Sequence, residues 1–346
     1  MPAIQIVNPL DIPDWDTYVY TFPDATIFHS AAWARVLIES YGFVPYYCIL
    51  YQGKEIAGIL PLMEVRDILG RKKGVSIPLS DFCEPLFSNL HDFQKAFELL
   101  TGIAQNKKWR AIELRGGEQW LSQELSYDKI YTHEIDLCPE PDIIFKSFSN
   151  TNRRNIRKAE KSGISVKHGN SLDAVKSFFY LNCLTRREHG LPPQPWKFFE
   201  NLWKIFLSQG KGFITLVSYD GRAIAGNVYF IFGDKVLYKY GAFDRSFQYL
   251  RPNNSAMWES IKHCRKIGCR RFYLGRTELH HRGLRQFKLG WTQNENLHNY
   301  YRYNVARKHF LKNKVSLNRG LTTKIFRFIP QPVLTTIGKI LYKYIA

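Results

Sequence analysis

The sequence of 346 residues has only six cysteines, and they form no metal-binding pattern. Neither a CxxC pair nor the Cys/His spacing of a zinc site is present, so we expect free thiols in a reducing compartment and no bound metal. The N-terminus has no charged-then-apolar secretion signal, and no apolar run reaches the roughly 18–20 residues that span a bilayer. These absences predict a cytoplasmic protein without transmembrane helices.

Acidic residues are scarce relative to basic ones. The chain has 30 Asp and Glu against 49 Lys and Arg, a formal net charge of +19. This excess favours acidic partners such as tRNA, phosphorylated substrates or an anionic lipid surface, although a merely basic soluble protein has the same composition. With 45% hydrophobic and 15% aromatic residues the chain can build packed cores, and its length suits two domains.

One segment occurs twice in diverged form. Residues 51–60 (YQGKEIAGIL) reappear as residues 219–228 (YDGRAIAGNV), and each copy is predicted as a hairpin that turns at its first glycine. A helical stretch precedes each hairpin, and a later helix leads into another strand. The matched pairs are 32–41 and 195–207, 93–106 and 254–267, and 111–116 and 271–276. Duplication explains this order better than chance.

The pattern predicts an α/β protein with mixed sheets, built from two similar domains. We expect the domains to cover residues 1–140 and 141–305, with a boundary near 138–150. A basic, amphipathic tail then covers residues 306–346.

Four short motifs in the second half occur together in one order. They are RRNIRKA (153–159), RREHGLP (186–192), LGRT (274–277) and GLRQFKLGW (283–291). With these motifs the chain resembles the Fem-type (FemAB-like) peptidoglycan-bridge aminoacyltransferases and related GNAT-superfamily acyltransferases over residues 153–303, and more loosely in the first half.

The resemblance implies two tandem GNAT-like acyltransferase domains. It implies transfer of an acyl or aminoacyl group to an amine of a cell-envelope precursor, either peptidoglycan or a lipid-linked polysaccharide. The donor would be aminoacyl-tRNA or acyl-CoA as a co-substrate, with no tightly bound cofactor. Two other functions remain open: a CoA-dependent N-acetyltransferase, and a non-catalytic protein that binds tRNA or a membrane.

Acyl transfer to an amine passes through a tetrahedral oxyanion, which needs a positive charge or N–H donors, and a path for the amine proton. No covalent nucleophile is needed, and the sequence has no GxSxG elbow. The resemblance implies that Lys288, next to Phe287, reaches the reacting carbonyl. His189 could accept the proton near neutral pH, and Asp81 could bind the acceptor amine. A surface lysine, a loop histidine and a turn aspartate would have the same sequence patterns.

Several further residues, Phe287 among them, are expected to bind substrate. Arg276 ends a predicted strand, and its guanidinium suits phosphate or carboxylate, although a structural ion pair would look the same. A helix capped within residues 149–152 would present a basic face to tRNA or a pyrophosphate-linked acceptor, or simply to solvent. By the resemblance, two more residues lie near the second-domain cleft, unless they pack or cap a helix. The arginines of this face and the two cleft residues are Arg153, Arg154, Arg157, Tyr240 and Asn253.

The expected phosphate-binding turn of the second domain contains no glycine. GNAT enzymes hold the CoA pyrophosphate on backbone N–H groups of a glycine-rich loop that opens a helix. The matching residues 245–254 (RSFQYLRPNN) lack it, which weakens CoA as the donor and leaves aminoacyl-tRNA open.

The tail after Ala306 has nine basic and no acidic residues. A helical stripe of apolar residues near its end could lie on an anionic membrane surface or dock on the protein's own core. A membrane-facing stripe would make the protein peripheral on the inner face of the membrane. The stripe consists of Val333, Leu334, Ile337, Ile340, Leu341, Tyr344 and Ile345.

Overall fold

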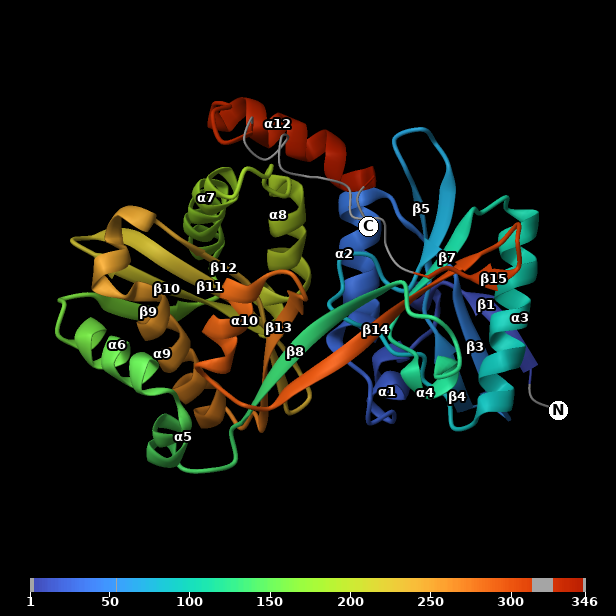
Figure 1. Cartoon of the computed structure of the whole chain (residues 1–346), viewed down its shortest axis with the longest axis horizontal. Coiled ribbons are helices and arrows are strands. Elements are labelled where there is room, and N and C mark those ends of the chain that lie inside the picture. The colour runs from blue at the N-terminus through green and yellow to red at the C-terminus, as the bar shows by residue number, and fades with distance from the viewer. Residues whose placement is uncertain (1–2, 54, 313–325, 345–346) are drawn as a thin grey trace. The chain divides into compact units, whose positions relative to one another are not determined.

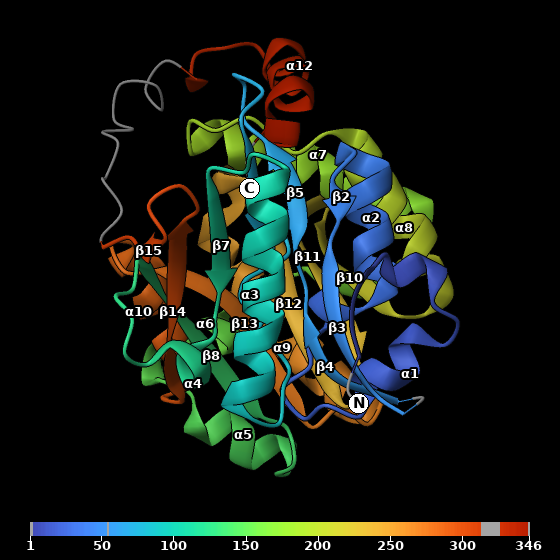
Figure 2. The same cartoon turned by 90° about the vertical axis from the view of Figure 1, so that its right-hand side faces the viewer.

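A computed structural model describes residues 3–53, 55–312 and 326–344 (Figures 1 and 2). The described residues divide into two compact units. Unit 1 contains residues 3–130, 297–312 and 340–344, and unit 2 contains residues 131–296 and 326–339. No helix within these described ranges is long and apolar enough to cross a membrane.

Unit 1 is a mixed α/β structure. Strands β1 (Ala3–Val7), β3 (Tyr47–Gln52) and β4 (Glu55–Leu60) form an antiparallel sheet in the order β1-β3-β4. Further strands follow one another in the order β2-β5-β6-β7-β14, and β15 pairs with β14. These strands are β2 (Val44–Pro45), β5 (Met63–Arg66), β6 (Lys72–Val75), β7 (Ala111–Arg115), β14 (Glu295–Asn304) and β15 (His309–Phe310). The helices are α1 (Trp15–Tyr20), α2 (Ala31–Tyr41), α3 (Leu90–Asn106) and α4 (Glu118–Leu121), with short turns η1 (Pro9–Asp11), η2 (Ile27–His29) and η5 (Tyr342–Tyr344).

Unit 2 is built on five consecutive strands with helices on both faces (Figure 1). The strands, in spatial order, are β9 (Ser165–Gly169), β10 (Gly212–Tyr219), β11 (Arg222–Phe232), β12 (Lys235–Phe243) and β13 (Arg271–Glu278), and β8 (Asp128–Asp136) leads into the unit from unit 1. Helix α7 packs against β11 and β12 with α8 beside it, and α9 packs against β10 and β11 with α6 beside it. The helices and turns are α5 (Pro141–Ser147), α6 (Asn150–Glu160), α7 (Leu172–Glu188), α8 (Trp196–Ile205), α9 (Pro252–Lys266), α10 (Arg282–Leu289), α12 (Gln331–Leu341), η3 (Leu207–Gln209) and η4 (Arg245–Leu250).

The two copies of the repeated segment form the predicted hairpins. Gly53 and Gly221 have φ of 66° and 73°, a left-handed turn conformation that glycine adopts without strain. The second glycine of the repeat leaves space for a neighbouring side chain in both units. Gly58 lies opposite Leu50, and a Cβ there would fall 2.4 Å from the Phe87 ring. The matching Gly226 lies opposite Leu216 and would carry a Cβ 3.0 Å from that side chain. Close packing against these strands therefore explains the glycine in each copy.

The C-terminal helix α12 docks on the protein by one side. Leu334 is fully buried, and a Cβ on Gly338 would lie 2.0 Å from the carbonyl oxygen of Pro193, so no larger residue fits there without movement. Val333 and Ile340 are each about half exposed. The expected apolar stripe is thus divided between a docked and an exposed part. Residues 313–325 of the tail and Ile345 lie outside the described residues.

Two histidines stack between α9 and strands β9 and β10 of unit 2. The rings of His168 and His263 are 4.3 Å apart, and His168 Nδ1 lies 2.9 Å from Thr215 Oγ1. Burial, followed by the neighbouring His263, lowers the pKa of His168 to about 4. The His168 ring is therefore neutral at pH 7, which suits its packed position.

We expect unit 2 to lose stability on acidification because of this pair. A histidine whose pKa is lowered by folding stabilises the fold above its unfolded pKa of about 6.5, and this contribution is lost as the pH falls towards 4. Between pH 7 and pH 5 the free energy of unfolding should fall by about 1 kcal/mol more in the wild type than in His168→Asn, after allowance for solvent screening. Urea unfolding at both pH values measures this difference, and equal losses in the two proteins would contradict it.

Candidate functional site

Strands β12 and β13 of unit 2 separate part-way along their length. They pair in parallel only through residues 235–237 of β12 and 271–273 of β13, although both strands continue beyond this point. Open α/β sheets bind ligands where neighbouring strands diverge at their carboxyl ends. The diverging ends, residues 239–243 and 274–278, therefore define the candidate site of unit 2.

Lys288 contacts the diverging end of β13. Its side chain extends from α10, is 3% exposed, and donates from Nζ to the carbonyl oxygens of Gly275 and Arg276, both at 2.8 Å. Gly275 has φ of 70°, which bends β13 and turns both carbonyls towards the ammonium group. The site thus contains a fixed, buried positive charge beside a kinked strand.

A network of charged side chains supports α10 on the side of Lys288. Glu295 accepts two hydrogen bonds from Arg285, at 2.8 and 2.7 Å, and lies 2.9 Å from His133 Nε2. Hydrogen bonding to Arg285 lowers the pKa of Glu295. Burial, then the charge of Lys288, lowers the pKa of His133, so this histidine stays neutral near pH 7. Arg285 and Lys288 both come from α10, and the network therefore fixes the helix that carries the buried charge.

Two of the other predicted residues of unit 2 lie on the strands that form this opening. Tyr240 is on β12 and Arg276 on β13, so both belong to its flanks. Tyr240 packs against Phe198 and Phe199, with ring centroids 6.1 and 6.0 Å away, and Arg276 lies 3.7 Å from Glu278. Asn253 is in the first turn of α9, and Phe287 packs against Trp291 with its ring centroid 6.1 Å away.

His189 is exposed at the C-terminal end of α7. Partial burial, then the charges of Arg186 and His281, lowers its pKa. A neutral imidazole at pH 7 can accept a proton, which is the role that the sequence suggested.

Helix α6 carries the three predicted arginines. Ser149 accepts a hydrogen bond from the backbone N–H of Asn152 at 3.2 Å, which confirms the cap expected within residues 149–152. Arg154 and Arg157 are exposed, and the Arg157 guanidinium lies 5.6 Å from the Phe145 ring centroid. Arg153 is partly buried and donates to the carbonyl oxygen of Lys146 at 3.3 Å. The helix therefore presents a basic face to solvent.

Backbone N–H groups in the turn between β12 and α9 donate hydrogen bonds to acceptors within the turn itself. Asp244 accepts a hydrogen bond from the backbone N–H of Ser246 at 3.0 Å, and its other carboxylate oxygen lies 2.7 Å from Arg222. Pro252 has no N–H, and the N–H of Asn254 donates to the carbonyl of Arg251 at 3.1 Å. A pyrophosphate at this turn would find few free N–H donors and a nearby carboxylate.

In unit 1, Asp81 lies on a strained loop between β6 and α3. Ile77 and Leu79 have φ of 48° and 62°, a region that branched side chains rarely adopt. Arg115, which is 7% exposed, donates to the carbonyl oxygen of Ser80 at 3.0 Å, and Asp81 is 4% exposed. Strained backbone conformations cluster at binding sites and other functional sites.

The rest of this loop contacts β14. Tyr300 donates a hydrogen bond to the carbonyl oxygen of Asp81. The ring of His298 stacks on Phe82, with centroids 4.4 Å apart, and its Nδ1 lies 3.6 Å from Glu84. Sequence reasoning singled out Asp81 but not its neighbours Arg115, Tyr300 and His298, which come from distant segments. The only signal was Leu-Arg-Gly at the end of β7, which parallels Leu-Gly-Arg in β13.

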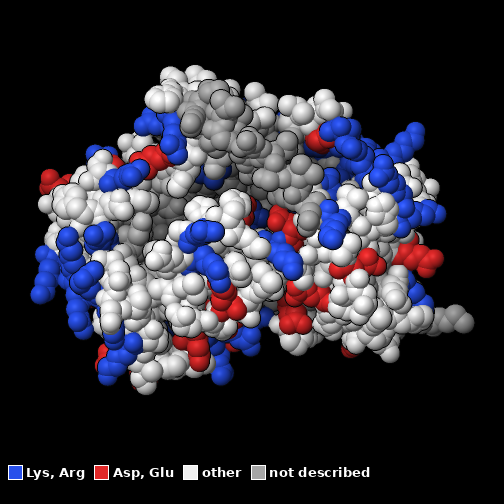
Figure 3. Space-filling model, in the orientation of Figure 1, with Lys and Arg blue, Asp and Glu red and all other residues white. Residues whose placement is uncertain are grey.

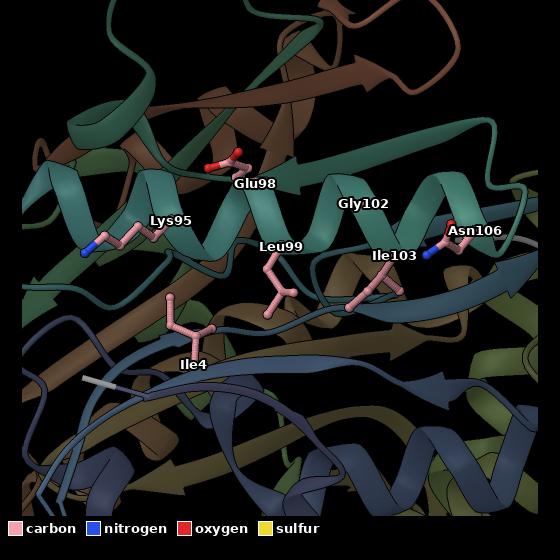
Figure 4. Close-up of a pocket in the computed structure, with 7 residues that line it drawn as sticks. All are labelled: Ile4, Lys95, Glu98, Leu99, Gly102, Ile103 and Asn106. Carbon is pink, nitrogen blue, oxygen red and sulfur yellow. The ribbon is translucent and has the colours of Figure 1, made fainter. Parts of the chain in front are cut away.

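Figure 4 shows a groove elsewhere in unit 1, between α3 and β1. It shares no residue with the loop that carries Asp81. Its lining residues are Ile4, Lys95, Glu98, Leu99, Gly102, Ile103 and Asn106. Across the part of the chain that the structure describes, no group of three or more His, Cys, Asp or Glu side chains could hold a metal ion. The β12–β13 opening and the Asp81 loop thus remain the candidate sites.

Residues 146–289 match the family model described as an acetyltransferase (GNAT) domain. The chain carries a GNAT acyltransferase fold. Among solved structures it is similar to FemX, with a TM-score of 0.68 and 16% identity over 94% of this chain and 100% of that chain. No curated protein sequence matches the chain.

Two further structures of similar fold contain GNAT or synthetase domains. A tandem GNAT protein from the clavulanic acid biosynthesis pathway has a TM-score of 0.57 and 9% identity, over 88% of this chain and 99% of that one. The C-terminal domain of a putative lysylphosphatidylglycerol synthetase from Agrobacterium fabrum has a TM-score of 0.53 and 11% identity, over 83% and 90%. These likenesses confirm the tandem GNAT-like fold and the resemblance to Fem-type and related GNAT proteins that the sequence indicated.

Proposed function

We propose that the chain is an N-acyltransferase that moves an aminoacyl group to an amine of a cell-envelope precursor, either peptidoglycan or a lipid-linked polysaccharide. The buried charge of Lys288 at the divergence of β12 and β13 carries this proposal. A lysine in that place can stabilise the oxyanion of acyl transfer. The likeness to FemX and to a lysylphosphatidylglycerol synthetase domain supports an aminoacyl donor and an envelope acceptor.

In the proposed reaction the acceptor amine attacks the carbonyl carbon of the donor ester. The C–N bond forms, and Lys288 stabilises the charge on the tetrahedral oxyanion. The ester C–O bond then breaks, and the leaving oxygen takes up the proton that the amine has lost and departs as the donor's hydroxyl group. His189 is our candidate to accept the amine proton, since its lowered pKa keeps it neutral at pH 7. In unit 1 we assign Asp81 to binding of the acceptor amine. Arg276 and Tyr240, on the flanks of the opening, would position the donor.

Aminoacyl-tRNA is favoured as the donor over acyl-CoA by the turn after β12. Asp244 occupies the N–H of Ser246 there, and its carboxylate would repel a pyrophosphate. The exposed arginines of α6, with Arg153 beside them, suit a polyanion such as tRNA instead. Acyl-CoA remains the second candidate because the matched family is an acetyltransferase domain.

A donor assay tests the proposal. The purified protein is mixed with extracted envelope precursors and either tRNA charged with labelled amino acids or labelled acetyl-CoA. We expect label in the precursor fraction from aminoacyl-tRNA, and none from a Lys288→Met control. Transfer from acetyl-CoA alone would favour the second candidate. Binding of tRNA without transfer from either donor would identify a non-catalytic protein.

A further inference from the structure

The hairpin between β5 and β6 in unit 1 exposes two adjacent large apolar side chains at its tip. Ile68 and Leu69 are 68% and 70% exposed, and among the large hydrophobic residues that the structure describes only Phe328 is more exposed. Single exposed apolar residues are common on protein surfaces, but an adjacent pair on a projecting turn indicates contact with another apolar phase.

Hydrogen bonds hold this tip in one conformation. The Asp67 carboxylate accepts from the backbone N–H groups of Leu69 at 2.9 Å and Arg71 at 3.0 Å, and from Arg71 Nε at 2.6 Å. Gly70 has φ of 72°, which closes the turn. The two apolar side chains are therefore presented outward by an ordered turn.

Basic residues surround the apolar tip. Arg66, Arg71 and Lys72 flank it on the hairpin, and the backbone N–H of Arg110 donates to the carbonyl of Lys72 at 2.9 Å, which brings the turn before β7 alongside β6. Figure 3 shows Lys and Arg side chains gathered over this hairpin and the adjoining end of β7. We name as the basic collar Arg66, Arg71, Lys72, Lys107, Lys108 and Arg110.

The acidic groups near the collar offset only part of its charge. Glu64 is 5% exposed and lies 3.5 Å from Arg66 and 3.4 Å from Lys72, and Asp67 pairs with Arg71. The three basic residues of the neighbouring turn, residues 107–110, are exposed. The collar therefore keeps a net positive charge towards solvent.

We propose that this hairpin is an anchor for an anionic phospholipid bilayer. Ile68 and Leu69 enter the boundary between headgroups and acyl chains, and the basic collar contacts the lipid phosphates. An apolar tip of this size binds weakly by itself, and the collar adds attraction that depends on anionic lipid. A second element of unit 1 adjoins the hairpin, because η5 packs against β5 and is preceded by the half-exposed Ile340.

A bilayer fits this surface better than the other partners that a basic patch could have. Nucleic acid would be bound by the cations alone or with aromatic side chains that stack on bases, and aliphatic Ile68 and Leu69 cannot stack in that way. A helix or peptide of a protein partner would call for a groove, whereas these residues project from a turn.

Vesicle sedimentation with the full chain tests the anchor. Vesicles of phosphatidylcholine that contain about 30% phosphatidylglycerol carry the anionic lipid that attracts basic segments. They are compared with vesicles of pure phosphatidylcholine. Three double variants are used: the tip variant Ile68→Ser/Leu69→Ser, the collar variant Arg66→Gln/Lys72→Gln, and a control, Leu125→Ser/Ile143→Ser, at residues that are 51% and 58% exposed. We expect the tip and collar variants to bind anionic vesicles roughly tenfold more weakly, and the control to bind as the wild type does.

Insertion itself is measured with an environment-sensitive dye on Leu69→Cys, in a Cys138→Ser background because Cys138 is the exposed native thiol. The emission of the dye should shift to the blue with anionic vesicles.

An unshifted emission, or a tip variant that binds vesicles normally, would overturn the proposal. So would a tip variant that loses tRNA binding or self-association instead. The anchor rests on unit 1 alone, and transfer to a soluble acceptor analogue should be unchanged in the tip variant.

Discussion

Replacement of Lys288 by methionine is expected to reduce the single-turnover rate of acyl transfer by roughly 10²–10³-fold, the usual effect of removing one oxyanion donor. Methionine has a similar length but no charge and no N–H. The variant also leaves the carbonyl oxygens of Gly275 and Arg276 without their 2.8 Å donor, so we expect a loss of about 1–3 kcal/mol in the free energy of unfolding.

Two measurements separate these effects. Single-turnover rates report chemistry, and urea unfolding reports the loss at the β13 kink. Lys266→Met, at an exposed position in the last turn of α9, is the matched control and should change neither. A Lys288→Met enzyme that is less stable but turns over normally would leave Lys288 as a structural residue. Arg276→Lys, which keeps the charge but loses the two-pronged guanidinium, should instead weaken donor binding.

Replacement of Arg115 by methionine should destabilise unit 1 by about 3 kcal/mol, because buried carbonyl oxygens lose a charged donor. Arg115 holds the loop through Ser80, and Ile77 and Leu79 keep their unfavourable backbone angles only while that loop is fixed. When the loop relaxes, the Asp81 side chain is displaced. If Asp81 binds the acceptor, the KM of the Arg115→Met variant for the acceptor should rise by more than about tenfold, while its rate at saturating acceptor changes less.

Arg35→Met, at an exposed site on α2, is the control for loss of one arginine in unit 1. Thermal unfolding and acceptor titration are measured on both variants. An Arg115→Met protein with reduced stability but an unchanged acceptor KM would remove the Asp81 loop from the binding site. Unchanged stability would contradict the assigned role of Arg115 itself.

The sequence predicted the elements of the fold well because their signals are local. The repeated segments gave both hairpins, and the turn glycines have the left-handed φ that the pattern required. Helix α3 was expected over 93–106 and runs Leu90–Asn106; α9 was expected over 254–267 and runs Pro252–Lys266. The residues that the prediction left out at the start of each helix belong to its first turn, where capping side chains and proline decide the boundary.

The candidate site was less predictable because its contacts join distant segments. Lys288 was singled out by a motif, but its acceptors are backbone carbonyls, which have no sequence signature. The pairing of His133 with Glu295 and the support of the Asp81 loop by Arg115 likewise depend on which strands become neighbours. An arginine next to a strand end is indistinguishable in sequence from one that faces water.

The pairing of β14 with β7 has a consequence for how the protein is made. Residues 300–304 of β14 pair with residues 111–115 of β7, yet all of unit 2 up to residue 296 lies between them in the chain. A nascent chain that has emerged only to residue 296 therefore lacks the part of β14 that pairs with β7, and the edge of β7 stays open. The sheet of unit 2, strands β9 to β13, can form before unit 1 is complete, the reverse of the usual N-terminal-first order. Ribosome-bound chains that have emerged from the exit tunnel as far as residue 296 should accordingly protect residues 131–296 from protease while unit 1 is still cleaved.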